Sequence, residues 1–182
     1  LKLLSCSVKE IIFGQSKDVS FDVLDMSWDE YMKMVINKTS PFIALPMMGM
    51  FKCKECSIDE CNGLQEASNY LGLSYQYLND VENLVGINQD IFSDIYKGHP
   101  NAMLINILEK LDLENKLKIK KEPKLLINYI NKKSIQEQKS NINNLLEDAR
   151  NQFHRVPMVV QPVLVSIEDE INDRLASLME EE

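Results

Sequence analysis

Glycine and proline are scarce in this chain of 182 residues, which contains six of each. Alternation of apolar and polar residues between turn signals, the pattern that predicts strands, is also missing. A chain with few helix breakers and 45% hydrophobic residues favours helices over sheets. We therefore expect an all-α protein, and the length is sufficient for one domain with a buried core.

Positive charge is also in short supply. Twenty lysines and arginines stand against 28 aspartates and glutamates, which gives a formal net charge of −8. Because nucleic-acid binding requires a basic surplus, we exclude nucleic acid as the main partner. The sequence has no run of 18 apolar residues, so it predicts no membrane span. Four cysteines without a secretory leader are typical of reduced thiols, and we expect a cytoplasmic protein.

The first residue is Leu1 rather than methionine, and residues 1–13 resemble the interior of a helix without a starting cap. We therefore expect residues 1–182 to be a single helical domain that forms the C-terminal part of a larger protein.

Two capping boxes predict where helices begin. Ser27-Trp28-Asp29-Glu30 and Ser57-Ile58-Asp59-Glu60 each place a glutamate three residues after a serine cap. They predict helices over about 27–50 and 57–86, the first bent by Pro41 and Pro46. We expect further helices near 100–111, 123–131, 134–152 and 162–180, a loop over 86–93 and a basic linker over 116–124.

A polar stripe on the second of these helices is the strongest chemical signal. Gln76, Asn79, Asp80 and Asn83 are spaced i, i+3, i+4 and i+7, so we expect all four to face the same way. Carboxylate and amide oxygens are suitable ligands for a hard divalent cation such as Mg²⁺, which in turn binds phosphate oxygens. The stripe therefore predicts a magnesium site.

Lys38-Thr39 is the second chemical signal. It lies just before Pro41 on an apolar helix. A lysine there must be paired, reach solvent along the helix, or bind an anion. If Lys38 is considered alone, the simplest alternative is that its side chain reaches solvent along the helix. Beside a metal site, however, a lysine would suit the diphosphate of an apolar, chain-like substrate.

Several short motifs follow one another in order: Gly14-Gln15…Asp18, Tyr31…Lys38-Thr39, Gly72…Gln76…Asn79-Asp80…Asn83 and Asp94…Gly98. Over residues 10–108 this order resembles the C-terminal half of the trans-isoprenyl diphosphate synthases, the polyprenyl synthetase family. The resemblance implies an isoprenoid-synthase-type helical bundle around a central apolar cavity. It also implies Mg²⁺-dependent prenyl transfer from an allylic diphosphate to isopentenyl diphosphate or another acceptor, and a homodimer or a heteromer with another synthase subunit.

The resemblance also implies roles for individual residues. Catalytic roles fall on Lys38, Thr39 and Gln76. Substrate-binding roles fall on Gln15, Asp18, Lys38, Thr39, Lys97 and His99. Metal-binding roles fall on Asn79, Asp80 and Asn83, which occupy the second aspartate-rich motif of the family.

The chain departs from the family pattern in ways that leave alternatives open. Asn79 and Asn83 replace aspartates, which weakens magnesium binding, and the first aspartate-rich motif is absent. In these departures the chain resembles the divergent synthase-like enzymes that prenylate a bacterial competence pheromone. One alternative is a non-catalytic or regulatory subunit that pairs with an active synthase. Another is a terpene cyclase, which Asn79-Asp80 favours and Ile87 opposes.

Cys53, Cys56 and Cys61 have spacing that begins like a zinc site. A structural zinc site needs four ligands, and the chain offers no suitable fourth near them. We interpret the three cysteines as a coincidence of a loop between two helices.

Overall fold

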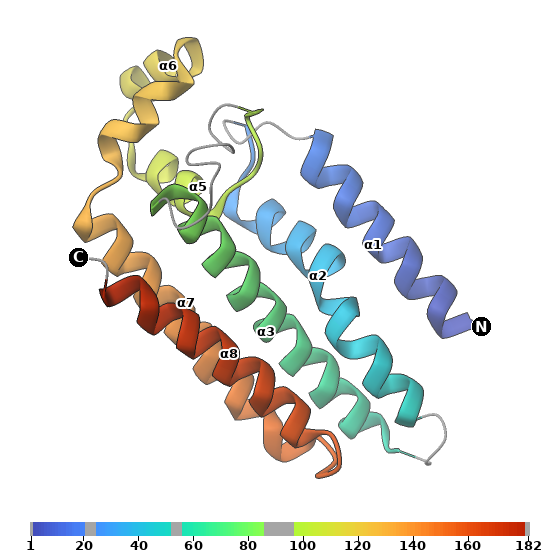
Figure 1. The fold of residues 1–182 in the computed structure, drawn as a ribbon. Helices are drawn as coiled ribbons and strands as arrows, with labels where there is room; N and C mark the ends of the chain where they lie inside the picture. Colours follow the sequence, from blue (N-terminus) through green and yellow to red (C-terminus); the bar gives the residue numbers. More distant parts are fainter. Residues whose placement is uncertain (1, 21–24, 52–55, 86–96, 181–182) are drawn as a thin grey trace.

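The computed structural model describes residues 2–20, 25–51, 56–85 and 97–180 (Figure 1). These residues form helices and connecting segments, with no strand among them, so the expected all-α class is confirmed. The α-helices are α1 (Lys2–Ser20), α2 (Trp28–Phe51), α3 (Ile58–Val85), α5 (Ala102–Lys110), α6 (Leu113–Lys121), α7 (Lys132–Gln152) and α8 (Gln161–Glu180). Two short 3₁₀ helices are η1 (Pro123–Tyr129) and η2 (Phe153–Arg155).

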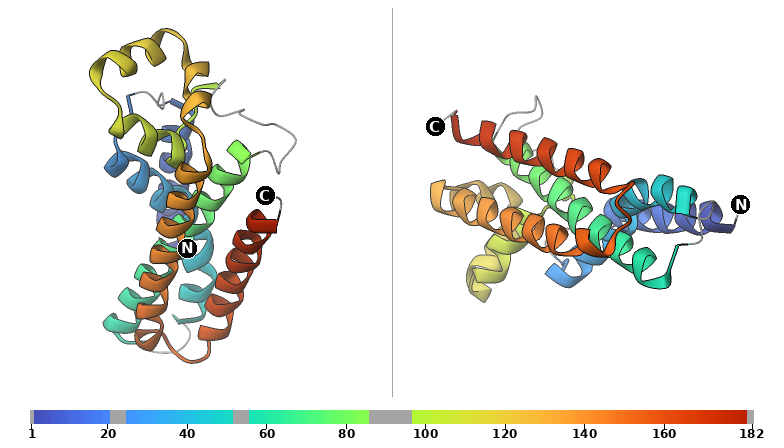
Figure 2. Two further views of the ribbon diagram at one scale, coloured as in Figure 1. Left: turned by 90° about the vertical axis from the view of Figure 1, so that its left-hand side faces the viewer. Right: turned by 90° about the horizontal axis from the view of Figure 1, so that it is seen from below.

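Helix α3 is the centre of the bundle. It packs against α2 on one side and against α7 and α8 on the other, while α1 packs on the outer side of α2 (Figure 1). The views in Figure 2 show that α7 and α8 each run along α3. The short helices α5, α6 and η1 gather at one end of the bundle (Figure 1). Different faces of α3 therefore contact different helices.

The core follows the apolar stripe of α3. Leu64, Leu71 and Leu78, spaced seven residues apart, are completely buried. Val35 of α2 and Ile142 of α7 are buried in the same cluster. Burial of a leucine contributes about 1.5–3 kcal/mol, so this stripe is a main source of stability.

Both predicted capping boxes are confirmed. The Ser27 N–H donates to Glu30 Oε2 at 3.0 Å, and the Glu30 N–H donates to Ser27 Oγ at 3.3 Å. The corresponding distances for Ser57 and Glu60 are 2.8 and 3.2 Å. In each box the hydrogen bonds from the serine, first that of its backbone N–H, lower the pKa of the glutamate. The sequence therefore predicted the starts of α2 and α3 correctly.

The prediction of a basic linker over 116–124 is wrong, because most of these residues belong to helix α6. Asp112 caps this helix by accepting a hydrogen bond from the Asn115 N–H at 2.8 Å. Glu114 pairs with Lys118 one turn later at 2.6 Å. The lysines of the last turn lie where the helix dipole favours positive charge. Basic residues thus stabilise a helix here instead of a solvated connection.

Helix α2 continues through both of its prolines and ends at Phe51. The predicted loop over 86–93 lies outside the described residues, as does Cys53. None of the described helices combines the length and the apolar composition that crossing a bilayer requires.

Candidate functional site

Gly14 sets how closely α1 approaches α2. A Cβ atom at this position would lie 2.5 Å from the backbone nitrogen of Lys38 and 2.8 Å from its Cα. Such distances are well inside van der Waals contact, so a side chain does not fit unless the helices move apart. The absence of a side chain at Gly14 therefore brings the following turn of α1 next to Lys38.

The next turn of α1 supplies Asp18 as a partner for Lys38 and Gln15 as a partner for Asp18. Lys38 Nζ lies 2.7 Å from Asp18 Oδ2, and Gln15 Nε2 donates to the same oxygen at 3.2 Å. The side chains of Lys38 and Asp18 are only 23% and 18% exposed. We call Gln15, Asp18 and Lys38 the Lys38 cluster. Three residues predicted to bind substrate are thus in contact, and the lysine is paired rather than directed to solvent alone.

Asp80 is the centre of a second group. This residue is 3% exposed, and its Oδ2 accepts hydrogen bonds from the Tyr31 hydroxyl and the Ala102 N–H, both at 2.7 Å. Oδ1 accepts from Gln76 Nε2 at 2.8 Å. We call Tyr31, Gln76, Asp80 and Ala102 the Asp80 cluster. It joins α2, α3 and α5 through one buried carboxylate.

Tyr31 belongs to the Asp80 cluster, and its pKa also responds to the charge of the Lys38 cluster. Burial, followed by the charge of Asp80 and its hydrogen bond, raises the pKa of Tyr31 well above its usual value. The charge of Asp18 acts in the same direction, so carboxylates of both clusters influence this phenol. Tyr31 therefore stays protonated and donates to Asp80, on the same helix that carries Lys38.

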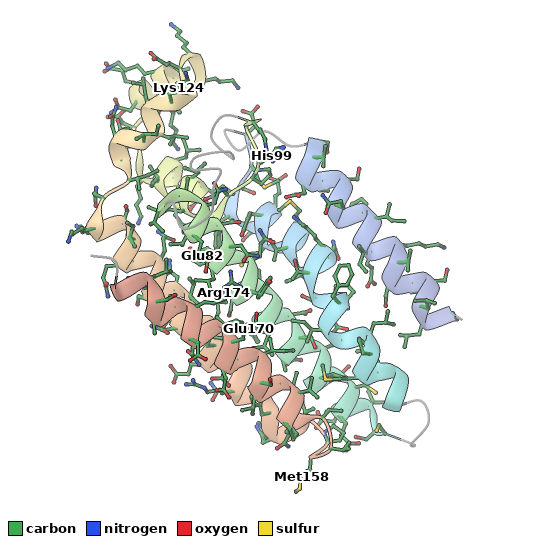
Figure 3. All side chains as sticks on the ribbon, viewed as in Figure 1. Glu82, His99, Lys124, Met158, Glu170 and Arg174 are labelled. Carbon is green, nitrogen blue, oxygen red and sulfur yellow. The ribbon has the colours of Figure 1, made fainter. Side chains whose placement is uncertain are left out.

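Asn79 does not face the same way as Asp80, contrary to our expectation for the polar stripe. Its Oδ1 accepts a hydrogen bond from Arg174 Nη2 of α8 at 2.6 Å. Asp80 is bonded instead to α2 and α5. Neighbouring residues of a helix point about 100° apart, and here α8 packs on one side of α3 and α2 on the other (Figure 3). The other predicted residues, Thr39 and Asn83, are half-buried.

The segment before α5 is anchored to the Asp80 cluster. Asn101 caps α5, and its Nδ2 donates to the backbone oxygen of Asp80 at 3.1 Å. His99, two residues earlier, is half-buried, and Lys97 is exposed. Gly98 between them has a φ of 71°, a conformation that favours glycine. Asp94 lies outside the described residues. Asn101 thus connects the segment that carries Lys97 and His99 to α3.

A mostly apolar cavity of about 280 Å³ lies between α1 and α2. Phe13, Met26 and Met34 supply its apolar lining, and Lys17, Glu30 and Lys33 bring charges of both signs to it. Lys38 is not among its lining residues, although Gly14 and Asp18 belong to the same stretch of α1 as Phe13 and Lys17. An apolar space and a lysine therefore lie near each other on these two helices.

The polar stripe does not fit a magnesium ion as it is packed here. Both oxygens of Asp80 accept hydrogen bonds from protein donors, and the oxygen of Asn79 accepts one from a cation. Within residues 2–20, 25–51, 56–85 and 97–180, no three or more His, Cys, Asp or Glu side chains converge on a possible metal position. We therefore derive no reaction step through a metal bound to this stripe.

The sequence analysis did not predict two features of this site, the pair of Arg174 with Glu82 and the role of Asn101. Arg174 and Glu82 are 92 residues apart, and no local pattern connects them. Asn101, in contrast, directly precedes an apolar helix, which is a signal for an N-cap. That signal would have placed the start of α5 one residue after Asn101, but not its bond to Asp80.

Comparison with known proteins gives consistent results. The family model described as polyprenyl synthetase matches residues 1–152. A short chain isoprenyl diphosphate synthase of Methanocaldococcus jannaschii is 28% identical over 123 residues, which are 65% of this chain and 38% of that protein. A geranylgeranyl diphosphate synthase of Saccharolobus solfataricus is 27% identical over 115 residues, 60% of this chain and 35% of that protein. The matched part of this chain thus covers less than two fifths of the length of each relative.

Solved structures share the fold. A decaprenyl diphosphate synthase from Rhodobacter capsulatus superposes with a TM-score of 0.79 at 13% identity, covering 96% of this chain and 59% of that one. A heptaprenyl diphosphate synthase from Staphylococcus aureus gives 0.78 at 21% identity, with 94% and 58% covered. These likenesses confirm the expected isoprenoid-synthase helical fold. None of these proteins supports the predicted similarity to competence-pheromone prenyltransferases.

Proposed function

The chain belongs to the polyprenyl synthetase family, and on that premise we propose that it takes part in Mg²⁺-dependent prenyl transfer. In this proposal an allylic diphosphate is the donor, and isopentenyl diphosphate or another acceptor receives the prenyl group. The observation that carries the proposal is the Lys38 cluster, in which the partly buried ammonium group of Lys38 is held by Asp18. The two helices that carry this cluster, α1 and α2, also line a mostly apolar cavity.

Lys38 is the residue that would hold the diphosphate. A cation fixed in a partly buried position stabilises the negative charge that develops on a departing diphosphate. In the absence of substrate, Asp18 neutralises Lys38, and Gln15 holds Asp18 in place. An arriving diphosphate would replace Asp18 as the partner of the positively charged Lys38. Thr39, next to Lys38, would contact the same head group.

Gln76 would assist from α3, because its amide is oriented by the hydrogen bond to Asp80. Lys97 and His99 would add positive charge from the segment that Asn101 anchors. Magnesium, when bound with a diphosphate, would supply further neutralisation of charge. Metal binding by Asn79, Asp80 and Asn83 requires a rearrangement of the contacts described above, so the proposal includes carboxylates from a partner chain or from a segment outside residues 1–182.

A second candidate function is that of a non-catalytic subunit in a homodimer or in a heteromer with another synthase. One observation favours it, because the Asn79 oxygen is bonded to Arg174 and is therefore not open to a metal ion. Such a subunit would bind substrate or shape the product cavity of an active partner.

One assay separates these functions. The chain is incubated with magnesium, labelled isopentenyl diphosphate and geranyl diphosphate, alone and together with a full-length synthase of the family. Elongated prenyl diphosphate from the chain alone supports the first function. A product distribution changed only in the presence of the synthase supports the second, and a cyclic hydrocarbon would identify a cyclase. If the chain neither turns over substrate nor changes the partner's products, both proposals are wrong.

A further inference from the structure

Arg174 of α8 forms an extensive set of contacts with α3. Its Nε donates to Glu82 Oε1 at 3.0 Å, and its Nη2 donates to Glu82 Oε2 and to Asn79 Oδ1, both at 2.6 Å. The guanidinium carbon lies 5.0 Å from the centre of the Tyr75 ring. Figure 3 shows Arg174 and Glu82 facing each other between α8 and α3. We call Asn79 and Glu82 together the Asn79–Glu82 face.

This arrangement is largely shielded from water. The side chain of Glu82 is 8% exposed and that of Arg174 is 25% exposed. Burial alone would lower the pKa of Arg174, but the hydrogen bonds and charge of Glu82 outweigh it, and the pKa is raised. The guanidinium therefore stays positively charged, and a planar fork on a carboxylate is a strong, directional contact.

The position of this cation matters because Asn79 occupies the first place of the metal-binding motif that the resemblance implies. Its side chain has one oxygen, and that oxygen is the acceptor for Arg174. A divalent cation bound to the same oxygen would stand within a few ångströms of the guanidinium charge. Charges of like sign repel strongly at such distances when water is largely excluded.

We propose that Arg174 is the resident cation of the Asn79–Glu82 face and that it excludes a divalent metal from Asn79. The side chain of α8 neutralises Glu82 permanently and keeps the Asn79 oxygen occupied. This inference concerns cation binding alone and does not depend on whether the chain transfers prenyl groups.

Mn²⁺ tests the proposal, because it resembles Mg²⁺ in its oxygen ligands and broadens nearby NMR signals. The chain is titrated with Mn²⁺, free ion is followed by electron paramagnetic resonance, and the side-chain amide signal of Asn79 reports binding at this face. The amide signal is needed because exposed acids of α8 such as Asp169, Glu170 and Asp173 will also attract Mn²⁺. In the wild-type chain, we expect Mn²⁺ not to broaden the Asn79 signal selectively.

Arg174→Gln removes the positive charge and keeps a polar side chain. We expect this variant to bind Mn²⁺ at the Asn79–Glu82 face roughly tenfold more tightly than the wild type, with selective broadening of Asn79. Arg150→Gln is the matched control, because Arg150 pairs with Glu168 between α7 and α8 and does not contact Asn79 or Glu82 in the structure. It should behave like the wild type.

Selective broadening of Asn79 in the wild-type chain would overturn the proposal, and so would an Arg174→Gln variant that folds but gains no Mn²⁺ binding. Circular dichroism shows whether the variant is folded. Because the wild-type titration requires no substitution, the proposal can be contradicted even if Arg174→Gln does not fold.

Discussion

Replacing Asp80 with alanine should lower the free energy of unfolding by roughly 3–5 kcal/mol. The substitution removes the acceptor of the hydrogen bonds from Tyr31, Gln76 and Ala102, and it leaves the buried Tyr31 hydroxyl and Ala102 N–H without this partner. It also leaves a cavity where α2, α3 and α5 meet. Urea unfolding followed by circular dichroism measures the effect as a lower midpoint with an unchanged slope.

Two control variants separate this network from a general loss of charge. Asp173→Ala removes a carboxylate from the exposed side of α8 and should change stability by less than about 0.5 kcal/mol. Tyr31→Phe removes one hydrogen bond of the Asp80 cluster and should cost about 1–2 kcal/mol. A loss below about 1 kcal/mol for Asp80→Ala would contradict the view that this carboxylate joins three helices.

The second large effect is expected at Gly14. In Gly14→Ala the new Cβ would meet backbone atoms of Lys38 at 2.5–2.8 Å, so α1 must move away from α2. We expect a net loss of about 1–3 kcal/mol, even though alanine favours a helix over glycine. Because Gln15 and Asp18 move with α1, the same variant should lose the Lys38–Asp18 pair. Urea unfolding and faster proteolysis of α1 report the change.

Gly49→Ala is the matched control for Gly14→Ala. Both glycines are inside helices, but a Cβ at Gly49 meets nothing within 4 Å. Gly49→Ala should therefore stabilise the chain by up to about 1 kcal/mol. Equal effects of the two substitutions would show that close contact between α1 and α2 at Gly14 is not required.

Local signals of the sequence predicted local structure well. The capping boxes at Ser27 and Ser57 fixed the starts of α2 and α3, because the groups involved are only three residues apart. The contact between the motif Gly14-Gln15…Asp18 and Lys38 was not predicted, and its physical reason appeared only in the structure. Gly14 allows α1 to approach α2 closely, and this approach brings Asp18 into contact with Lys38.

Contacts between distant segments were not predictable in the same way. The helical period places Gln76, Asn79, Asp80 and Asn83 in one broad sector, but it does not say which neighbour covers each side of that sector. Helix α8 contacts Asn79 through Arg174, whereas α2 and α5 surround Asp80. The partners of a polar stripe depend on packing, and a pattern within one helix contains no information about it.

Binding of geranyl diphosphate to the wild-type chain and to Lys38→Met, measured by isothermal titration calorimetry, tests the central claim most directly. The claim is that the Lys38 cluster holds a diphosphate head group. We expect wild-type binding that weakens by about tenfold or more in Lys38→Met, because one charge-assisted contact is lost. Lys118→Met, which makes the same change in charge on the distant helix α6, should bind like the wild type. Equal binding by Lys38→Met and the wild type, or no binding by the wild type, would contradict the account.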